Sequence, residues 1–66
     1  MNPNLTPRQK EIISLKARGL MERQIADRLY ISLDTVKTHL QTSYSRLGAI
    51  NAPHAVYLAM KGGLLN

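Results

Sequence analysis

Five polar residues, separated by one to four positions, carry the clearest chemical signal in the sequence. At about 100° per residue, one side of a helix over residues 33–47 collects Asp34, Lys37, Thr38, Gln41 and Ser45, here named the polar face. Each side chain donates or accepts hydrogen bonds. This chemistry suits base edges in the DNA major groove, which display a distinct donor and acceptor pattern for each base pair. It equally suits the solvated face of an ordinary amphipathic helix, so the pattern alone leaves both interpretations open.

The helix that carries the polar face has marked ends. Ser32 is a good N-cap, because its hydroxyl can accept a hydrogen bond from a free amide of the first turn. Asp34 lies in that turn, where the helix dipole favours negative charge. Gly48 can adopt the left-handed conformation that ends a helix. The side opposite the polar face is expected to turn toward the core: Val36, His39, Leu40, Ser43 and Leu47.

Similar signals predict three further helices, over residues 7–18, 22–29 and 52–61. Thr6 and Gln9 have the spacing of a capping box, and Asn51 is a candidate N-cap. Gly19 ends the first of these helices, and a Gly pair ends the last. The residues expected to face inward are Ile12, Ile13, Leu15, Ile25, Ala26 and Leu29, with Ala17 packed at the edge and Leu20 as a core plug. Residues 1–4 are predicted to be a short tail, and Leu64 and Leu65 are expected to fold back on the core.

Only three residues, Tyr30 to Ser32, separate the second and third predicted helices, with an apolar residue inside the connection. That layout is a helix-turn-helix. The fold class is therefore predicted to be all-α, with four helices.

The composition limits the possible functions. Sixty-six residues make one small domain, and such a chain buries only about 60% of its unfolded surface. Nine Lys and Arg residues against four Asp and Glu residues give a net charge of +5, which favours a polyanionic partner such as nucleic acid or an anionic membrane. The sequence lacks the long apolar run of a membrane span and the apolar start of an export signal, so we expect a cytoplasmic protein without membrane contact.

An enzyme is poorly supported by the same residues. The sequence has no Cys, no clustered pair of carboxylates, no Gly-rich phosphate loop and only two His residues. So small a core leaves little room for a pocket that excludes water, so no cofactor or small-molecule ligand is expected. His39 and His54 are too far apart along the chain to make a convincing metal site.

An ordered set of motifs gives the chain a family resemblance. The set comprises Leu5-Thr6-Pro7-Arg8, Gly19-Leu20, Ile25-Ala26, Leu29, Ile31-Ser32, Thr35-Val36-Lys37-Thr38-His39-Leu40 and Leu47-Gly48. In this order and at this spacing it resembles the DNA-binding domain of the LuxR family, also called the GerE or FixJ/NarL type. The resemblance covers about residues 5 to 65, and we assign residues 5–66 to this domain. The receiver or ligand-binding domain that usually precedes it is missing here, so the chain is expected to be a stand-alone GerE-like module or a fragment of a larger regulator.

The resemblance implies a four-helix bundle that contains the helix-turn-helix and whose third helix reads the DNA major groove. The family's base-reading positions fall on Lys37, Thr38 and Gln41, and its phosphate-contact positions match Arg23 and Thr35. The implied function is a sequence-specific regulator of transcription that binds double-stranded DNA, encoded by a bacterium or one of its phages.

Family members commonly pair through the fourth helix, which implies a homodimer here. The apolar candidates for that contact are Val56, Tyr57 and Met60, although plain packing within the domain explains these residues equally well. A second functional hypothesis follows from the same helix. The chain would then be an interaction module that pairs with a longer regulator of the family and modulates it.

Four residues depart from the family pattern. Gln9 stands where Glu is usual and Ala52 where Arg is usual, so any ion pair between these two positions is absent. Met21 replaces a usual Ser or Thr cap, and Ser at this position is expected to stabilise the domain by about 1 kcal/mol. Ser43 replaces an apolar core residue, which loosens the third helix unless its hydroxyl bonds back to the preceding turn. None of the four lies on the polar face.

Overall fold

A computed structural model describes residues 5–63 of the chain. It contains four α-helices, α1 (Pro7–Ala17), α2 (Glu22–Leu29), α3 (Leu33–Leu47) and α4 (Ala52–Lys61), and no strand within the described residues. The all-α prediction is confirmed, and three of the four helices have the predicted bounds. The first ends one residue earlier than predicted, because Arg18 leaves the helix as its C-cap. The predictions for residues 1–4, Leu64 and Leu65 concern positions outside the described part of the chain.

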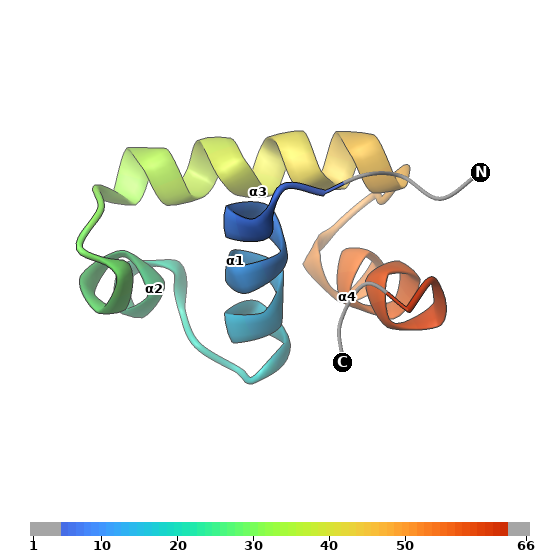
Figure 1. Cartoon of the computed structure of the whole chain (residues 1–66), viewed down its shortest axis with the longest axis horizontal. Coiled ribbons are helices and arrows are strands. Elements are labelled where there is room, and N and C mark those ends of the chain that lie inside the picture. The colour runs from blue at the N-terminus through green and yellow to red at the C-terminus, as the bar shows by residue number, and fades with distance from the viewer. Residues whose placement is uncertain (1–4, 64–66) are drawn as a thin grey trace.

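Helix α3 is the longest element and lies across the other three helices. Figure 1 shows α3 along the top of the view, α2 on the left, α4 on the right, and α1 between them. Helix α1 packs against all three other helices, and so does α3, whereas α2 and α4 make no contact with each other. Helices α1 and α3 therefore hold the domain together. Within the described residues, no helix is both long and apolar enough to cross a lipid bilayer.

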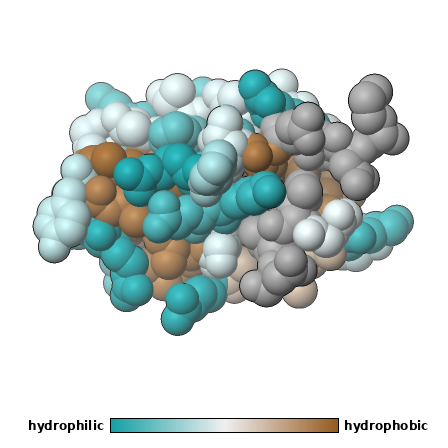
Figure 2. All heavy atoms as spheres, viewed as in Figure 1, coloured by the Kyte–Doolittle hydropathy of each residue, from teal (hydrophilic) through white to brown (hydrophobic). Residues whose placement is uncertain are grey.

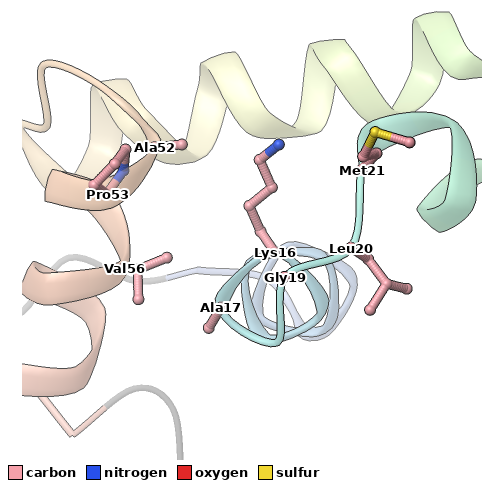
Figure 3. Close-up of a pocket in the computed structure, with 8 residues that line it drawn as sticks. All are labelled: Lys16, Ala17, Gly19, Leu20, Met21, Ala52, Pro53 and Val56. Atoms are coloured by element: carbon pink, nitrogen blue, oxygen red, sulfur yellow. The ribbon is translucent and has the colours of Figure 1, made fainter.

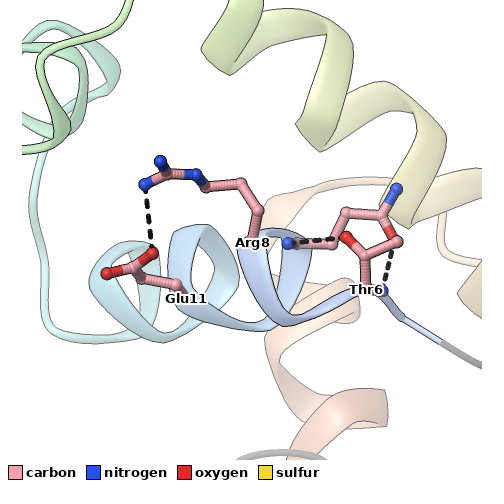
Figure 4. Close-up of polar contacts among 4 residues, drawn as sticks. Thr6, Arg8 and Glu11 are labelled. Carbon is pink, nitrogen blue, oxygen red and sulfur yellow. Dashed lines mark hydrogen bonds and ion pairs between the residues drawn. The ribbon is translucent and has the colours of Figure 1, made fainter.

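Side-chain caps start three of the helices, as predicted. The Thr6 hydroxyl accepts from the Gln9 amide at 3.1 Å, and the Gln9 side-chain oxygen accepts from the Thr6 amide at 2.9 Å, which completes a capping box (Figure 4). The Ser32 hydroxyl accepts from the Thr35 amide at 3.1 Å at the start of α3. At the start of α4 the Asn51 side-chain oxygen accepts from the His54 amide at 2.9 Å.

The apolar residues of all four helices form a single core. Its buried members are Leu5, Ile12, Ile13, Leu15, Ile25, Ala26, Val36, Leu40, Ala55 and Ala59. Leu20 packs against this core, as expected for a plug. The prediction that Ala17 packs at the core edge is wrong. Ala17 is exposed, because it is the last residue of α1 and lines the wall of an open groove.

The turn between α2 and α3 depends on one unusual backbone conformation. Tyr30 ends α2 in the left-handed region, with φ 58° and ψ 42°, although it is not glycine. Its side chain is 95% exposed, while the next residue, Ile31, packs against the core and donates its amide to the Ala26 carbonyl at 3.1 Å. The partly buried Ile31 thus anchors the turn between α2 and α3 to the core.

Candidate nucleic-acid interface

The polar face of α3 points away from the core, as predicted. All five of its residues are exposed. On the opposite side Val36, Leu40 and Ser43 are buried, while His39 and Leu47 are half-buried. In Figure 2 the upper edge, which α3 forms, is covered mainly by hydrophilic and near-neutral atoms, with brown hydrophobic atoms showing lower in the view. The helix therefore presents a continuous hydrogen-bonding surface to whatever approaches it.

The three side chains predicted to contact bases have no partner in the described part of the chain. Among residues 5–63, the side chains of Lys37, Thr38 and Gln41 form no hydrogen bond or ion pair. They lie within little more than one turn of α3, near its N-terminal half. Their donors and acceptors are thus available to an external ligand, without a prior interaction to break. Asp34, in the first turn of the same helix, is also exposed, and its negative charge is stabilised there by the helix dipole.

The two residues predicted to contact phosphate lie at the starts of α2 and α3. Arg23 is exposed in the first turn of α2. The Thr35 hydroxyl lies 2.8 Å from the Ser32 hydroxyl, and Ser32 also accepts from the Thr35 amide. Either hydroxyl can donate to the other, so one O–H of the pair remains available for a third group. The structure therefore adds Ser32 to this candidate set, in which sequence analysis saw only a helix cap.

A small hollow adjoins the polar face. It has a volume of about 360 Å³, lies between the start of α2 and the side of α3, and is here named the α2–α3 hollow; its lining residues are Glu22, Lys37, Leu40, Gln41 and Tyr44. Burial raises the pKa of the Tyr44 hydroxyl above its ordinary value, and the negative charge of Glu22 raises it further. Glu22 pairs with Lys16 of α1, whose ammonium lies 3.8 Å from a carboxylate oxygen.

Sequence analysis missed Glu22 and Tyr44 as site residues. The signal for Tyr44 was present, since a residue seven positions after Lys37 lies only about 20° from it around a helix. Glu22 gave no such signal, because its place beside Tyr44 depends on how α2 packs against α3.

A larger groove lies between α1 and α4. It has a volume of about 580 Å³, and its lining residues are Lys16, Ala17, Gly19, Leu20, Met21, Ala52, Pro53 and Val56. Figure 3 shows Lys16 extending from α1 toward α3, while Ala52, Pro53 and Val56 lie on the α4 side of the groove. None of the polar-face residues lines this groove, so it is separate from the candidate nucleic-acid interface.

The three apolar candidates on α4 have different surroundings. Val56 is half-buried and packs against the core, whereas Tyr57 and Met60 are 57% and 61% exposed. The Lys61 ammonium lies 5.9 Å from the centre of the Tyr57 ring, within the range of a cation–π contact. The His54 side chain is engaged at the start of α4, where its Nδ1 accepts from the Ile50 amide at 3.2 Å.

Comparison with known proteins agrees with this geometry. The family model described as bacterial regulatory proteins, luxR family (GerE), matches residues 3–59. The chain belongs to the luxR family. The helix-turn-helix of α2 and α3, with α1 and α4 around it, is the arrangement that the resemblance implied.

Two relatives show how the luxR-family match extends over the chain. The transcriptional activator protein BjaR1 of Bradyrhizobium diazoefficiens is 40% identical over 62 residues, which are 94% of this chain and 26% of that protein. The "probable transcriptional regulatory protein NarL" of Mycobacterium tuberculosis is 39% identical over 64 residues, covering 97% of this chain and 30% of that protein.

A crystal structure shows the same fold. The response regulator ChrA of a heme-sensing two-component system superposes with a TM-score of 0.91 and 42% identity, over 94% of this chain and 31% of that one. The chain thus spans less than a third of each of these three proteins.

Proposed function

We propose that this luxR-family chain is a sequence-specific domain that binds double-stranded DNA and regulates transcription, with α3 inserted in the major groove. The observation that carries the proposal is a set of three side chains, Lys37, Thr38 and Gln41, which have no partner among residues 5–63. They lie on the exposed face of the second helix of a helix-turn-helix. The net charge of +5 supports a polyanionic partner. The named relatives are themselves transcriptional regulators, and contact with bacterial chromosomal DNA implies a cytoplasmic location.

Each side chain has a role that its chemistry suggests. Lys37 donates to O6 or N7 of guanine, Gln41 pairs with adenine, and Thr38 contacts a thymine methyl group or an acceptor. Arg23 and the Ser32–Thr35 hydroxyl pair bind phosphate oxygens, which set the register of the protein on the duplex without reading its sequence.

We also propose that α4 pairs two copies of the chain. Exposed Tyr57 and Met60 support this assignment, with Val56 behind them. Two paired domains would bind half-sites about one helical turn of DNA apart. The same exposed residues support the second candidate function, in which α4 pairs with a longer luxR-family regulator and modulates it.

The test is selection of bound DNA from a random pool by the purified protein. The parent should enrich a motif with two half-sites. Lys37→Ala should lose preference at one base of each half-site and weaken binding to the parent motif about ten- to hundredfold. Lys10→Ala is the matched control, because it removes the same charge from an exposed position on α1. If both variants bind the motif equally well, α3 does not read the sequence.

A second variant separates the two candidate functions. Met60→Glu places a charge on the exposed side of α4 and should abolish pairing, so the variant occupies single half-sites with reduced affinity. If Met60→Glu abolishes the regulatory effect in cells while Lys37→Ala leaves it intact, the interaction module is the correct function.

A further inference from the structure

The α2–α3 hollow combines three hydrogen-bonding side chains on one stripe of α3. Lys37, Gln41 and Tyr44 line it from α3, and Glu22 lines it from the first turn of α2. Two of these residues also belong to the polar face, so the hollow opens beside the surface proposed to enter the major groove. In a helix-turn-helix the first helix crosses the DNA backbone while the second lies in the groove. The hollow between the two helices is therefore next to the path of one DNA strand.

The Tyr44 hydroxyl is suited to a backbone phosphate. Its ring packs against the core, which fixes the side chain, and its hydroxyl forms no hydrogen bond with any other residue between 5 and 63. A phenol that stays protonated donates one hydrogen bond, and a phosphate oxygen is a strong acceptor. Tyr44 thus offers a fixed donor without a partner at the edge of the DNA-facing surface.

Glu22 is the feature that opposes a phosphate in this place. A carboxylate on the wall of the hollow repels a phosphate, and both groups lose hydration as they approach. The Lys16 ammonium, 3.8 Å from Glu22, offsets that charge from the α1 side. Lys16 and Glu22 are both partly covered, with side chains 22% and 34% exposed, so solvent screens this pair less than a pair on the open surface.

We propose that Tyr44 is a further DNA-contacting residue, whose hydroxyl donates to a backbone phosphate at the mouth of the α2–α3 hollow. Lys16 is a positioning residue in this arrangement, because its pairing with Glu22 reduces the repulsion between the Glu22 carboxylate and the phosphate. The inference rests on the proposed function and adds a contact that sets register, not sequence, so it should strengthen binding to every DNA sequence.

The first experiment compares Tyr44→Phe with the parent on the duplex that the selection enriches. The substitution removes one hydroxyl and keeps the packed ring. We expect affinity to fall about tenfold on the selected site and on unrelated DNA alike. The slope of log affinity against log salt should stay unchanged, because Tyr44 carries no charge and releases no counterion. Tyr30→Phe is the matched control, since the Tyr30 side chain is 95% exposed, lines no part of the hollow and should leave affinity unchanged.

A modified duplex identifies the phosphate. Replacing one phosphate at a time by an uncharged methylphosphonate should weaken the parent at several positions. At one of these positions Tyr44→Phe should lose nothing further, because its hydroxyl no longer contacts that phosphate. If Tyr44→Phe binds as tightly as the parent, or loses affinity equally at every methylphosphonate position, the proposed contact is overturned.

The charge balance of the hollow has its own test. Lys16→Met leaves Glu22 unpaired and should weaken binding about threefold to tenfold, and the further change Glu22→Gln should restore the affinity. If the double variant binds as weakly as Lys16→Met, Lys16 does not act through Glu22. Thermal unfolding of each variant shows whether its domain is folded at the binding temperature.

The outcomes separate this inference from the proposed function. If the parent binds no DNA, both are overturned. If Lys37→Ala weakens binding while Tyr44→Phe does not, the polar face reads DNA and the inference about Tyr44 alone is wrong.

Discussion

Helix α2 begins without the cap that the other three helices have, and this defect is correctable. Met21 occupies the N-cap position with φ −78° and ψ 158°, the extended conformation of a capping residue, but its side chain makes no cap hydrogen bond. Gln24 already accepts from the Met21 amide at 2.8 Å. In α1 the other half of the box is supplied by the Thr6 hydroxyl, which accepts from the Gln9 amide. Met21→Ser supplies the missing acceptor for the Gln24 amide.

Two opposing terms set the size of the effect. A Ser cap contributes about 1 kcal/mol relative to Ala. Met21 is 65% exposed, so its loss removes roughly a third of the burial of a Met side chain, or about 0.5–1 kcal/mol. Relative to the parent, Met21→Ser should therefore change the free energy of unfolding very little. The cap alone would add about 1 kcal/mol, but the lost burial of Met21 offsets most of that gain. Against Met21→Ala, however, Met21→Ser should be more stable by about 1 kcal/mol.

Thermal unfolding followed by far-UV circular dichroism measures the difference. For a domain of this size, about 1 kcal/mol corresponds to roughly 4–8 °C in Tm between the Ser and Ala variants. Thr6→Ala is the reciprocal control, because it removes the equivalent hydroxyl from α1 and should lower Tm by a similar amount. Equal Tm values for Met21→Ser and Met21→Ala, alongside a loss in Thr6→Ala, would refute the reasoning.

Four other substitutions or conditions test the remaining features. Gly48→Ala should lower the free energy of unfolding by about 1–2 kcal/mol in urea unfolding, because an Ala side chain is strained at a φ of +70°. No further loss from a clash is expected, since no neighbouring atom lies within 4 Å of the added Cβ. Ser43→Ala should change the free energy of unfolding by less than about 1 kcal/mol, since the helix also bonds the carbonyl of His39 that the buried Ser43 hydroxyl contacts at 2.7 Å. Above pH about 10 the parent should lose stability that Tyr44→Phe retains, because a raised folded-state pKa lets the unfolded Tyr44 ionise first. In a double-mutant cycle, the variant with both Gln9→Glu and Ala52→Arg should gain more free energy of unfolding than the two single variants added together. An additive result would exclude an ion pair between the two positions.

Local signals explain why most of the fold was predictable. Thr6, Ser32 and Asn51 each bond an amide three residues ahead, so a helix start can be inferred from a short stretch of sequence. Gly48 adopts the expected left-handed conformation for the same local reason. Ser43 bonds back to the preceding turn, which is the condition under which a polar residue is tolerated there.

Features that depend on tertiary packing escaped prediction. Tyr30 adopts a left-handed conformation that its own side chain does not favour, at the turn after which Ile31 packs against the core. Ala17 is exposed because α1 ends beside a groove that only the position of α4 creates. Likewise, the α2–α3 hollow brings Glu22 to Tyr44 across 22 positions of sequence. The periodicity of α3 predicted the polar face, whereas the neighbours of that face could be identified only from the packed helices.

The lack of contact between α2 and α4 has an evolutionary consequence. Within residues 5–63 these two helices are linked by packing only through α1 and α3, which contact both of them. A substitution on the outer side of α4 therefore leaves the α2–α3 turn undisturbed, and a substitution on the outer side of α2 leaves α4 undisturbed. Selection can therefore alter the exposed surface of α4 and the exposed surface of α3 as separate traits, one surface change at a time.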